Sequence, residues 1–174
     1  MNAENGVVVT DHAAAEVEVA IRAISDPEIP VLTLDDLGIV RSVAVDDEHG
    51  TVTVVLTPTY SGCPATRLIE DLVGHQIRRA GFQPEVRTQL SPPWSTDWMS
   101  TDGKRKLSEF GIAPPGERPE AEGTALLTLH RRQVVCPRCG SQDTEEISRF
   151  GSTACKALRR CRSCGDPFDE FKAI

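Results

Sequence analysis

Two pairs of cysteines near the end of the chain constrain its fold more than any other feature. They read Cys136-Pro-Arg-Cys139-Gly and Cys161-Arg-Ser-Cys164-Gly, so each pair is a C-x-x-C motif followed by glycine. This spacing lets two thiolates reach one ion from a tight turn, and the glycine accepts the positive φ that such a turn needs. Two such turns can build a closed tetrahedral site of four sulfurs, which suits Zn2+ and also a rubredoxin-type iron. The sequence therefore predicts a small β zinc ribbon with structural zinc on Cys136, Cys139, Cys161 and Cys164.

Disulfides and free thiols are the alternative uses of these cysteines. Residues 1–10 contain no basic start followed by an apolar run of signal length, so we expect no export. No stretch approaches the ~18 consecutive apolar residues of a membrane span. We therefore expect a cytoplasmic chain with no membrane contact, and in a reducing cytoplasm paired cysteines favour metal over disulfides.

Charge is unevenly distributed along the sequence. Of 19 Lys and Arg and 26 Asp and Glu, residues 131–174 hold nine and six, which leaves ten and twenty for the rest. The tail is thus near +3 and the remainder near -10. A basic tail could bind RNA, dock on an acidic protein or form an ordinary solvated surface. The net charge of -7 disfavours a nucleic-acid binder.

Hydrophobic periodicity before the tail predicts the order helix–strand–strand–helix–strand–helix. The helices are expected at 11–24, 64–80 and 101–110, and the strands at 39–45, 51–57 and 83–90. This order predicts an α+β fold, a two-layer α/β sandwich over residues 1–112.

A stretch rich in Pro, Gly and Glu at 113–123 is predicted to be a linker. The zinc ribbon then occupies residues 124–174, with strands expected at 124–129, 144–150 and 168–174. A module of this size buries little core, so metal binding should supply most of its folding free energy.

Cys63 is the only cysteine outside the tail. It directly precedes Pro64, which places it at or near the start of the long predicted helix, where the helix dipole favours thiolate over thiol. A thiolate is what a metal ligand or a nucleophile requires. Asp26 and Glu28 form a second polar cluster, which could approach Cys63 and help to bind a metal. Alternatively, Cys63 is a half-buried helix cap and Asp26 caps a turn, and sequence spacing does not decide between the two.

Cys155 lies between the two cysteine pairs, where four ligands already complete a tetrahedral site. Three roles remain open for it. It is a small buried residue of the ribbon, an alternative ligand, or a second sulfur that shares a transient two-thiol site with Cys63.

The first 110 residues contain four short motifs, in an order by which this part of the chain resembles the SufT-like metal–sulfur cluster biosynthesis domain. They are Asp26-Pro-Glu-Ile-Pro30, Leu37-Gly-Ile-Val40, Leu56-Thr-Pro-Thr-Tyr-Ser-Gly-Cys-Pro64 and Pro92-Pro-Trp94. The resemblance covers residues 16–110 and implies a small α/β domain that serves iron–sulfur protein maturation. It also implies that Cys63 is the cluster-handling thiol and that Asp26 and Glu28 are the acidic motif.

The whole chain is similar to a narrower family. With the segment Trp94–Ser100 and a ribbon that contains Phe150-Gly-Ser-Thr-Ala-Cys155, it resembles the PaaD family of small D subunits of the bacterial phenylacetyl-CoA epoxidase system. The resemblance implies an accessory role in phenylacetate degradation. The protein would load or keep iron–sulfur clusters in the epoxidase complex, with a transient iron or cluster as cargo and the ferredoxin-reductase subunit as client.

We expect the chain itself to be non-catalytic, because it has no E-x-x-H pair of the di-iron kind and no G-x-G-x-x-G loop. Two other functions remain open, a stable structural subunit of the oxygenase and a zinc-ribbon nucleic-acid binder. A homodimer is compatible with the sequence.

Overall fold

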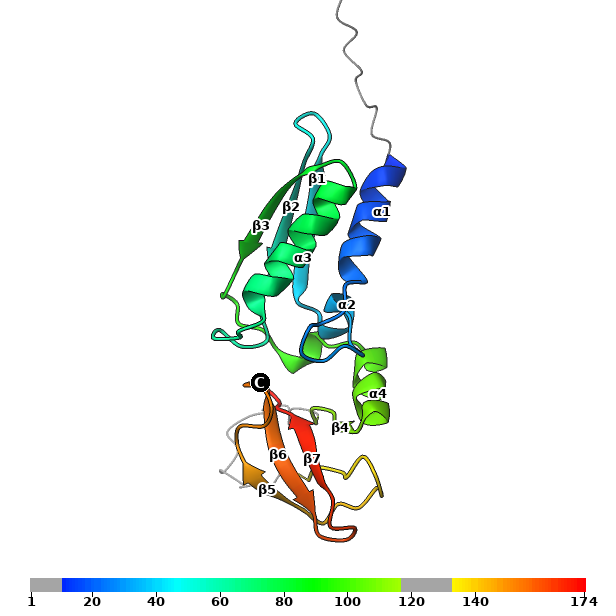
Figure 1. Cartoon of the computed structure of the whole chain (residues 1–174), viewed down its shortest axis with the longest axis vertical. Coiled ribbons are helices and arrows are strands. Elements are labelled where there is room, and N and C mark those ends of the chain that lie inside the picture. The colour runs from blue at the N-terminus through cyan, green and yellow to red at the C-terminus, as the bar shows by residue number, and fades with distance from the viewer. Residues whose placement is uncertain (1–10, 117–132) are drawn as a thin grey trace, which may run out of the picture.

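The computed structural model describes residues 11–116 and 133–174 of the chain. Its first part contains four helices, a short 3-10 turn and three strands (Figure 1). In chain order these are α1 (Asp11–Arg22), α2 (Leu34–Leu37), β1 (Val40–Asp46), β2 (Thr51–Leu56), α3 (Thr66–Arg79), β3 (Gln83–Thr88), η1 (Thr96–Trp98) and α4 (Thr101–Phe110). The second part contains β4 (Ile112–Ala113), β5 (Thr144–Ser148), β6 (Lys156–Cys161) and β7 (Pro167–Phe171).

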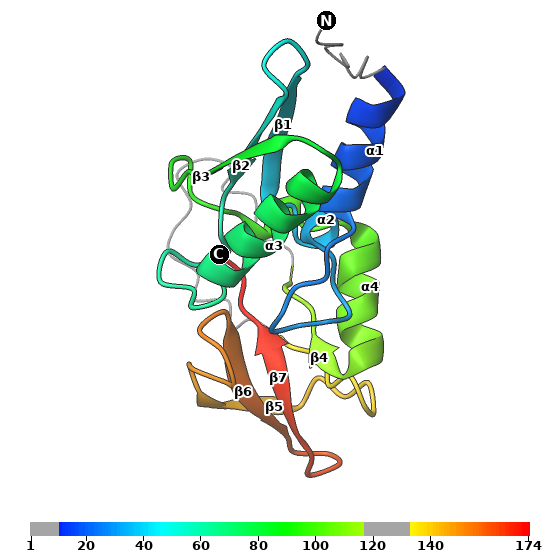
Figure 2. The same ribbon diagram turned by 45° about the horizontal axis from the view of Figure 1, so that its top comes forward.

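The first part is the predicted α+β sandwich. Its sheet has the order β1-β2-β3, with β1 antiparallel and β3 parallel to β2. The parallel pair needs a crossover, and α3 supplies it by lying across one face of the sheet with α1 beside it (Figures 1 and 2). Val52, Val54 and Leu56 of β2 alternate into the core under these helices and are almost fully buried.

The helices of this layer bury one apolar face each. Val17 and Ile21 of α1 are four residues apart and buried, and α3 repeats this spacing with Ile69, Val73 and Ile77. The i, i+4 spacing places these side chains on one side of each helix, toward the sheet. Among the described residues, no helix is both long enough and apolar enough to cross a membrane.

The second part is a four-stranded sheet with the order β4-β7-β6-β5. β6 was not predicted, because its pattern is broken by two charged residues that are nevertheless buried. Arg159 is one of them, and its Nη1 lies 2.9 Å from Glu170 Oε2 on the neighbouring strand. Lys156 is the other, and its Nζ lies 3.6 Å from Asp169 Oδ2. These pairs make burial of the charges tolerable, so a strand forms where hydrophobic periodicity gives no signal.

The first strand of the ribbon sheet lies before residue 124, the predicted start of the ribbon. The strand predicted at 124–129 lies outside the described residues. β4 joins the ribbon sheet by pairing with β7 in parallel, Ile112 with Asp169 and Ala113 with Glu170. The division of the chain at 112 and 124 stays a prediction.

The two parts share a buried junction. The Trp94 ring packs against that of Phe171 from β7, with centroids 5.9 Å apart, while its Nε1 donates to the Leu37 carbonyl at 2.9 Å. The Thr96 N–H donates to the Ile174 carbonyl at 3.3 Å. The end of the chain thus lies between the sandwich and the ribbon (Figure 1), next to the loop that precedes α3.

Candidate metal centre and thiol site

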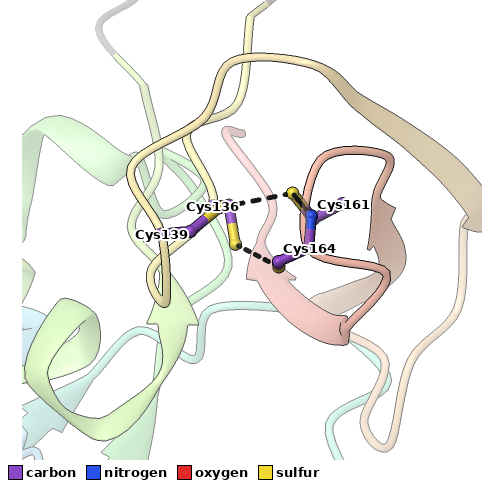
Figure 3. A group of neighbouring side chains, drawn as sticks. All are labelled: Cys136, Cys139, Cys161 and Cys164. Carbon is purple, nitrogen blue, oxygen red and sulfur yellow. Dashed lines mark hydrogen bonds between the residues drawn. The ribbon is translucent and has the colours of Figure 1, made fainter.

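The four ribbon cysteines converge on one point. Their sulfurs all lie within 4.8 Å of one another, with Cys136 Sγ 3.9 Å from Cys164 Sγ and Cys139 Sγ 3.5 Å from Cys161 Sγ. Figure 3 shows the two turns facing each other with the sulfurs between them. A zinc–sulfur distance of about 2.3 Å implies sulfurs roughly 3.8 Å apart in a tetrahedron. The observed spacing therefore fits a tetrahedral ion of zinc's size.

Both turns have the same backbone structure. The N–H of Gly140 donates to the Cys136 carbonyl, and that of Gly165 donates to the Cys161 carbonyl, each at 2.9 Å. Both glycines have positive φ, 73° and 82°. The predicted reason for glycine after each cysteine pair is thus confirmed, since a side chain at these positions would be strained.

The thiols of this cluster cannot all ionise without a cation. The Cys164 N–H lowers the pKa of the Cys161 thiol to about 6. The Ser141 N–H also favours ionisation of Cys139, but the neighbouring cysteines outweigh it and raise the pKa of that thiol to about 12. One negative charge forms readily and opposes the next, so four thiolates require a bound cation.

Cys63 lies in the loop between β2 and α3. Its N–H donates to the Tyr60 carbonyl at 3.0 Å, and its own carbonyl accepts from the Thr66 N–H at 3.2 Å. Cys63 thus lies two residues before the N-cap of α3, in agreement with the prediction that it lies at or near the start of that helix. The chain makes one further turn, closed by the Cys63 carbonyl, before α3 begins, and the N-cap is Ala65.

The ionisation of Cys63 differs from the predicted preference for thiolate. Burial raises the pKa of its thiol, the Ala65 N–H and Thr66 hydroxyl oppose this, and the charges of Glu28 and Asp26 add to the increase. The donors at the start of α3 do favour thiolate, as the helix-terminus argument predicts, but they are outweighed. In the metal-free chain Cys63 is a neutral thiol at physiological pH.

Asp26 and Glu28 lie on the Cys63 side of the sandwich. The buried Asp26 Oδ1 accepts from the N–H groups of Glu28 and Ile29, at 2.9 and 2.7 Å, and this turn holds the acidic segment in place. Asp26 and Cys63 line one small cavity, whose wall is otherwise mostly apolar and includes Leu37 and Ile69.

The cavity has a volume of about 20 Å3. This is enough for one water-sized group, which needs about 10–15 Å3, but not for a cluster of four atoms. A single metal ion fits inside, whereas an iron–sulfur cluster would have to sit at the mouth with one edge toward Cys63.

Cys155 belongs with this region and not with the ribbon cysteines. It is 8% exposed and packs in the hydrophobic core of the sandwich, while Cys136 and Cys161 belong to a separate ribbon core. The role of alternative ribbon ligand is therefore not supported by the packing.

Two parts of this site were not predicted from the sequence. One is the hydroxyl of Thr66, which acts on the Cys63 sulfur and could have been found from its i+3 spacing within a capping turn. The other is a second cavity of about 190 Å3 beside the first, lined by Tyr60, Ser61 and Ile174 among others. No local signal connects Ile174 to a loop more than 100 residues earlier.

Two family profiles match separate parts of the chain. The family described as iron–sulfur cluster assembly protein matches residues 14–83, which include Cys63, Asp26 and Glu28. The PaaD zinc beta ribbon domain matches residues 120–172, which include all four ribbon cysteines. The two profiles thus coincide with the two sites described above.

Similar proteins span either the whole chain or its first part. An Escherichia coli (strain K12) protein, provisionally named as the D subunit of 1,2-phenylacetyl-CoA epoxidase, is 47% identical over 160 residues, 91% of this chain and 92% of that protein. The Fe-S protein maturation auxiliary factor SufT of Staphylococcus aureus (strain USA300) is 39% identical over 84 residues, 47% of this chain and 93% of that protein. A solved structure from Bacillus anthracis, a domain of unknown function called DUF59, has a TM-score of 0.50 and 27% identity. It covers 55% of this chain and 92% of that chain.

Proposed function

This chain belongs to the PaaD family, the D subunits of the phenylacetyl-CoA epoxidase system, and on that premise we propose that it assists iron–sulfur cluster assembly or maintenance in that system. It acts in the cytoplasm as an accessory protein, and the oxygenase chemistry belongs to other subunits. Its client is the iron–sulfur reductase subunit. The cargo is an iron ion or a cluster, held transiently.

One observation carries this proposal, the position of Cys63 with Asp26 at an apolar cavity and with Glu28 near enough for its charge to act on the thiol. Thiolate is a soft ligand that suits iron–sulfur chemistry, and the carboxylates add charge that attracts a cation. A set of one thiol and two carboxylates leaves an iron ion incompletely ligated, so the client can take it over. The apolar wall limits access of water to the cargo.

The four ribbon cysteines have a different task. They form a closed set that fits Zn2+, and a closed set suits a structural ion and not an exchangeable one. The zinc would fix the two turns and, through β6 and β7, the ribbon sheet. The ribbon surface is then available to dock on the client.

The test is to co-express the chain with the other epoxidase subunits, purify the complex anaerobically and measure iron and acid-labile sulfide in the reductase subunit. Substitution Cys63→Ser should lower both, while zinc stays at one per chain. Ser108→Ala is the control, because Ser108 is exposed on α4, lines neither cavity and should have no effect. A fully loaded reductase with the Cys63→Ser variant would show that Cys63 is not a carrier.

A stable structural subunit is the second candidate, and an exposed apolar strip on α3 favours it. Leu68 and Leu72 lie one turn apart and are 49% and 36% exposed. Exposed leucines at this spacing suit burial against another subunit. Stoichiometric co-purification with the oxygenase that survives Cys63→Ser but is lost on Leu68→Glu would support this role.

Nucleic-acid binding is disfavoured by the pairing of charges on the ribbon. Arg159 pairs with Glu170, and Arg162 Nη2 lies 2.7 Å from Glu145 Oε2. These cations are already neutralised within the described part of the ribbon, so they contribute little to a phosphate-binding surface.

A further inference from the structure

The position of Cys155 has no explanation in the zinc site. The ribbon has its own small core, formed by Ala113, Val134, Cys136, Cys161 and Phe168. Cys155 lies outside this core and is buried in the larger one, against which Cys63 also packs. The ribbon thus places a fifth cysteine inside the sandwich domain, in the same core region as the cluster-handling candidate.

The backbone connects Cys155 to the Cys63 loop through the end of the chain. The carbonyl of Cys155 accepts from the Lys172 N–H at 2.9 Å. Two residues later, Ile174 lines the second cavity together with Tyr60 and Ser61. The Tyr60 carbonyl in turn accepts from the Cys63 N–H at 3.0 Å. The end of the chain thus lies between Cys155 and the Cys63 loop, although 92 residues separate the two cysteines in sequence.

Electrostatic effects place the same groups together. Burial raises the pKa of Cys155 most, the Thr153 hydroxyl and Lys156 oppose it, and the charges of Cys63 and Glu28 raise it further. Coulomb interactions weaken with distance, so the groups whose charges act most on Cys155 are those that lie nearest to it. Thr153 Oγ1 lies 3.0 Å from Cys155 Sγ and orients the sulfur.

We propose that Cys155 is a second thiol ligand, which binds one thiophilic divalent cation jointly with Cys63 at the junction of sandwich and ribbon. Asp26 and Glu28 provide nearby oxygen donors. This deepens the proposed function and rests on it. Each thiol gives up its proton to solvent or to a carboxylate, and the sulfur supplies both electrons of its bond to the metal, so two protons leave for each cation bound and no electron is transferred.

The arrangement is open in the metal-free chain. Only the ribbon cysteines, within the described ranges, bring three or more ligand atoms within 4.8 Å of one another. The junction ligands would have to close around the ion as it binds. Such a site binds more weakly and releases more readily than the ribbon site, which suits a cation in transit.

The experiment uses the full chain with zinc in the ribbon site and Co2+ as the probe. Thiolate bound to Co2+ gives a charge-transfer absorption in the near ultraviolet that serine and alanine cannot give. The wild-type chain should take up Co2+ beyond its zinc with this absorption. Cys155→Ala and Cys155→Ser should each weaken Co2+ binding at least about tenfold, because loss of a residue that only supports a metal ligand already costs about this much. Both variants should also reduce the absorption per bound Co2+. Ser108→Ala, at an exposed position of α4, keeps both thiols and their hydrogen bonds and is the control.

The outcomes separate this proposal from the proposed function. If Cys63→Ser and Cys155→Ala both weaken Co2+ binding, while melting curves show folded variants, the shared site is supported. If only Cys63→Ser weakens it, the carrier role of Cys63 stands and the shared site is overturned. If neither variant changes the binding, or only Cys155→Ala does, the joint site is overturned and the proposed function loses its metal-binding basis too.

Discussion

At the scale of single residues, the environment of Cys63 acts differently before and after a cation arrives. Burial raises the pKa of the thiol, and the Glu28 and Asp26 charges add to this, so the empty site holds a neutral thiol. A neutral thiol is a poor nucleophile and resists oxidation. When a cation binds, the proton leaves, and the same carboxylates then stabilise the positive charge. The acidic neighbours of Cys63 therefore keep the thiol protonated while the site is empty, and they attract the cation that the thiolate binds.

Glu28→Gln should make Cys63 more reactive toward alkylation. The substitution removes a negative charge that raises the pKa of the thiol, so the thiolate fraction and the rate with iodoacetamide rise at a given pH near neutrality. The rate is measured on iron-free protein, with the modified residue identified by mass spectrometry. Asp47→Asn, in the exposed turn between β1 and β2, removes the same charge elsewhere and should leave the rate unchanged. An equal or slower rate for Glu28→Gln would contradict the electrostatic argument.

The environment of Asp36 should make the free energy of unfolding depend on pH. Burial raises the pKa of its carboxyl, but hydrogen bonds from Lys106, Thr33 and Ser100 together lower it below the ordinary 3.8. A depressed folded-state pKa contributes stability above the unfolded value, and this contribution is lost as the pH falls through the folded value. Asp36→Asn should therefore lower the free energy of unfolding by about 2 kcal/mol at neutral pH, and by progressively less as the pH falls below the ordinary 3.8 and through the lowered folded-state pKa.

Denaturant melts at several pH values test this prediction. Asp102→Asn is the matched control, because Asp102 binds the same Lys106 Nζ, at 3.0 Å, but from an exposed position. Its substitution should have a much smaller effect. A loss for Asp36→Asn that stays constant from pH 7 down to the lowest pH at which the protein remains folded would exclude the carboxylate charge as its cause.

At the scale of elements, regular patterns could be predicted and irregular ones could not. The three main helices and the three sandwich strands have clear periodicity, and each was predicted within a few residues. β6 was missed because Lys156 and Arg159 are buried through ion pairs that only the fold provides. α2 and β4 have four and two residues, too short for any period to show. The parallel pairing of β3 with β2 depends on the crossover and has no local signal either.

Gly38 shows how strictly one of these short elements is constrained. It ends α2 with a φ of 66°, and a Cβ there would collide with the carbonyl oxygen of Trp98. Gly38→Ala should therefore lower the free energy of unfolding by about 2–5 kcal/mol, the sum of the cost of the left-handed conformation and the cost of overpacking. Gly111→Ala is the control, because Gly111 has a φ of 91° but open space around its Cβ position. It should cost only about 1 kcal/mol. Equal losses in thermal or denaturant unfolding would mean that the Trp98 contact relaxes freely.

At the scale of the whole molecule, the ribbon contributes side chains to the core of the sandwich. The Trp94 ring contacts Phe171, and Phe171 is 1% exposed within the sandwich core although β7 belongs to the ribbon. Cys155 enters the same core. The sequence predicts two sites in two domains, but not that the second domain completes the core beside the first site. That contact joins residues about 80 apart, which no spacing rule connects.

Because the ribbon contributes to this core, removal of the ribbon metal should change the environment of Trp94. The chain has two tryptophans, so the variant Trp98→Phe leaves Trp94 as the single tryptophan, whose emission can be excited selectively. Chelation of the metal should unfold the two cysteine turns and release β7, because metal binding supplies most of the folding free energy of so small a module. Loss of the Phe171 packing costs about 3–5 kcal/mol, which corresponds to a fall in Tm of roughly 6–20 °C for a chain of this size.

The fluorescence of Trp94 should then shift to longer wavelength at the chelator concentration that removes the metal, and restored zinc should reverse it. Phe171→Ala, with zinc retained, should reproduce most of the shift without loss of metal, which separates the packing from the ion. A sandwich that keeps both its Trp94 emission and its Tm after the metal has left would mean that the two parts fold independently. In that case a closed zinc site could not hold Cys155 in place beside Cys63, and the ribbon would serve only as a docking surface.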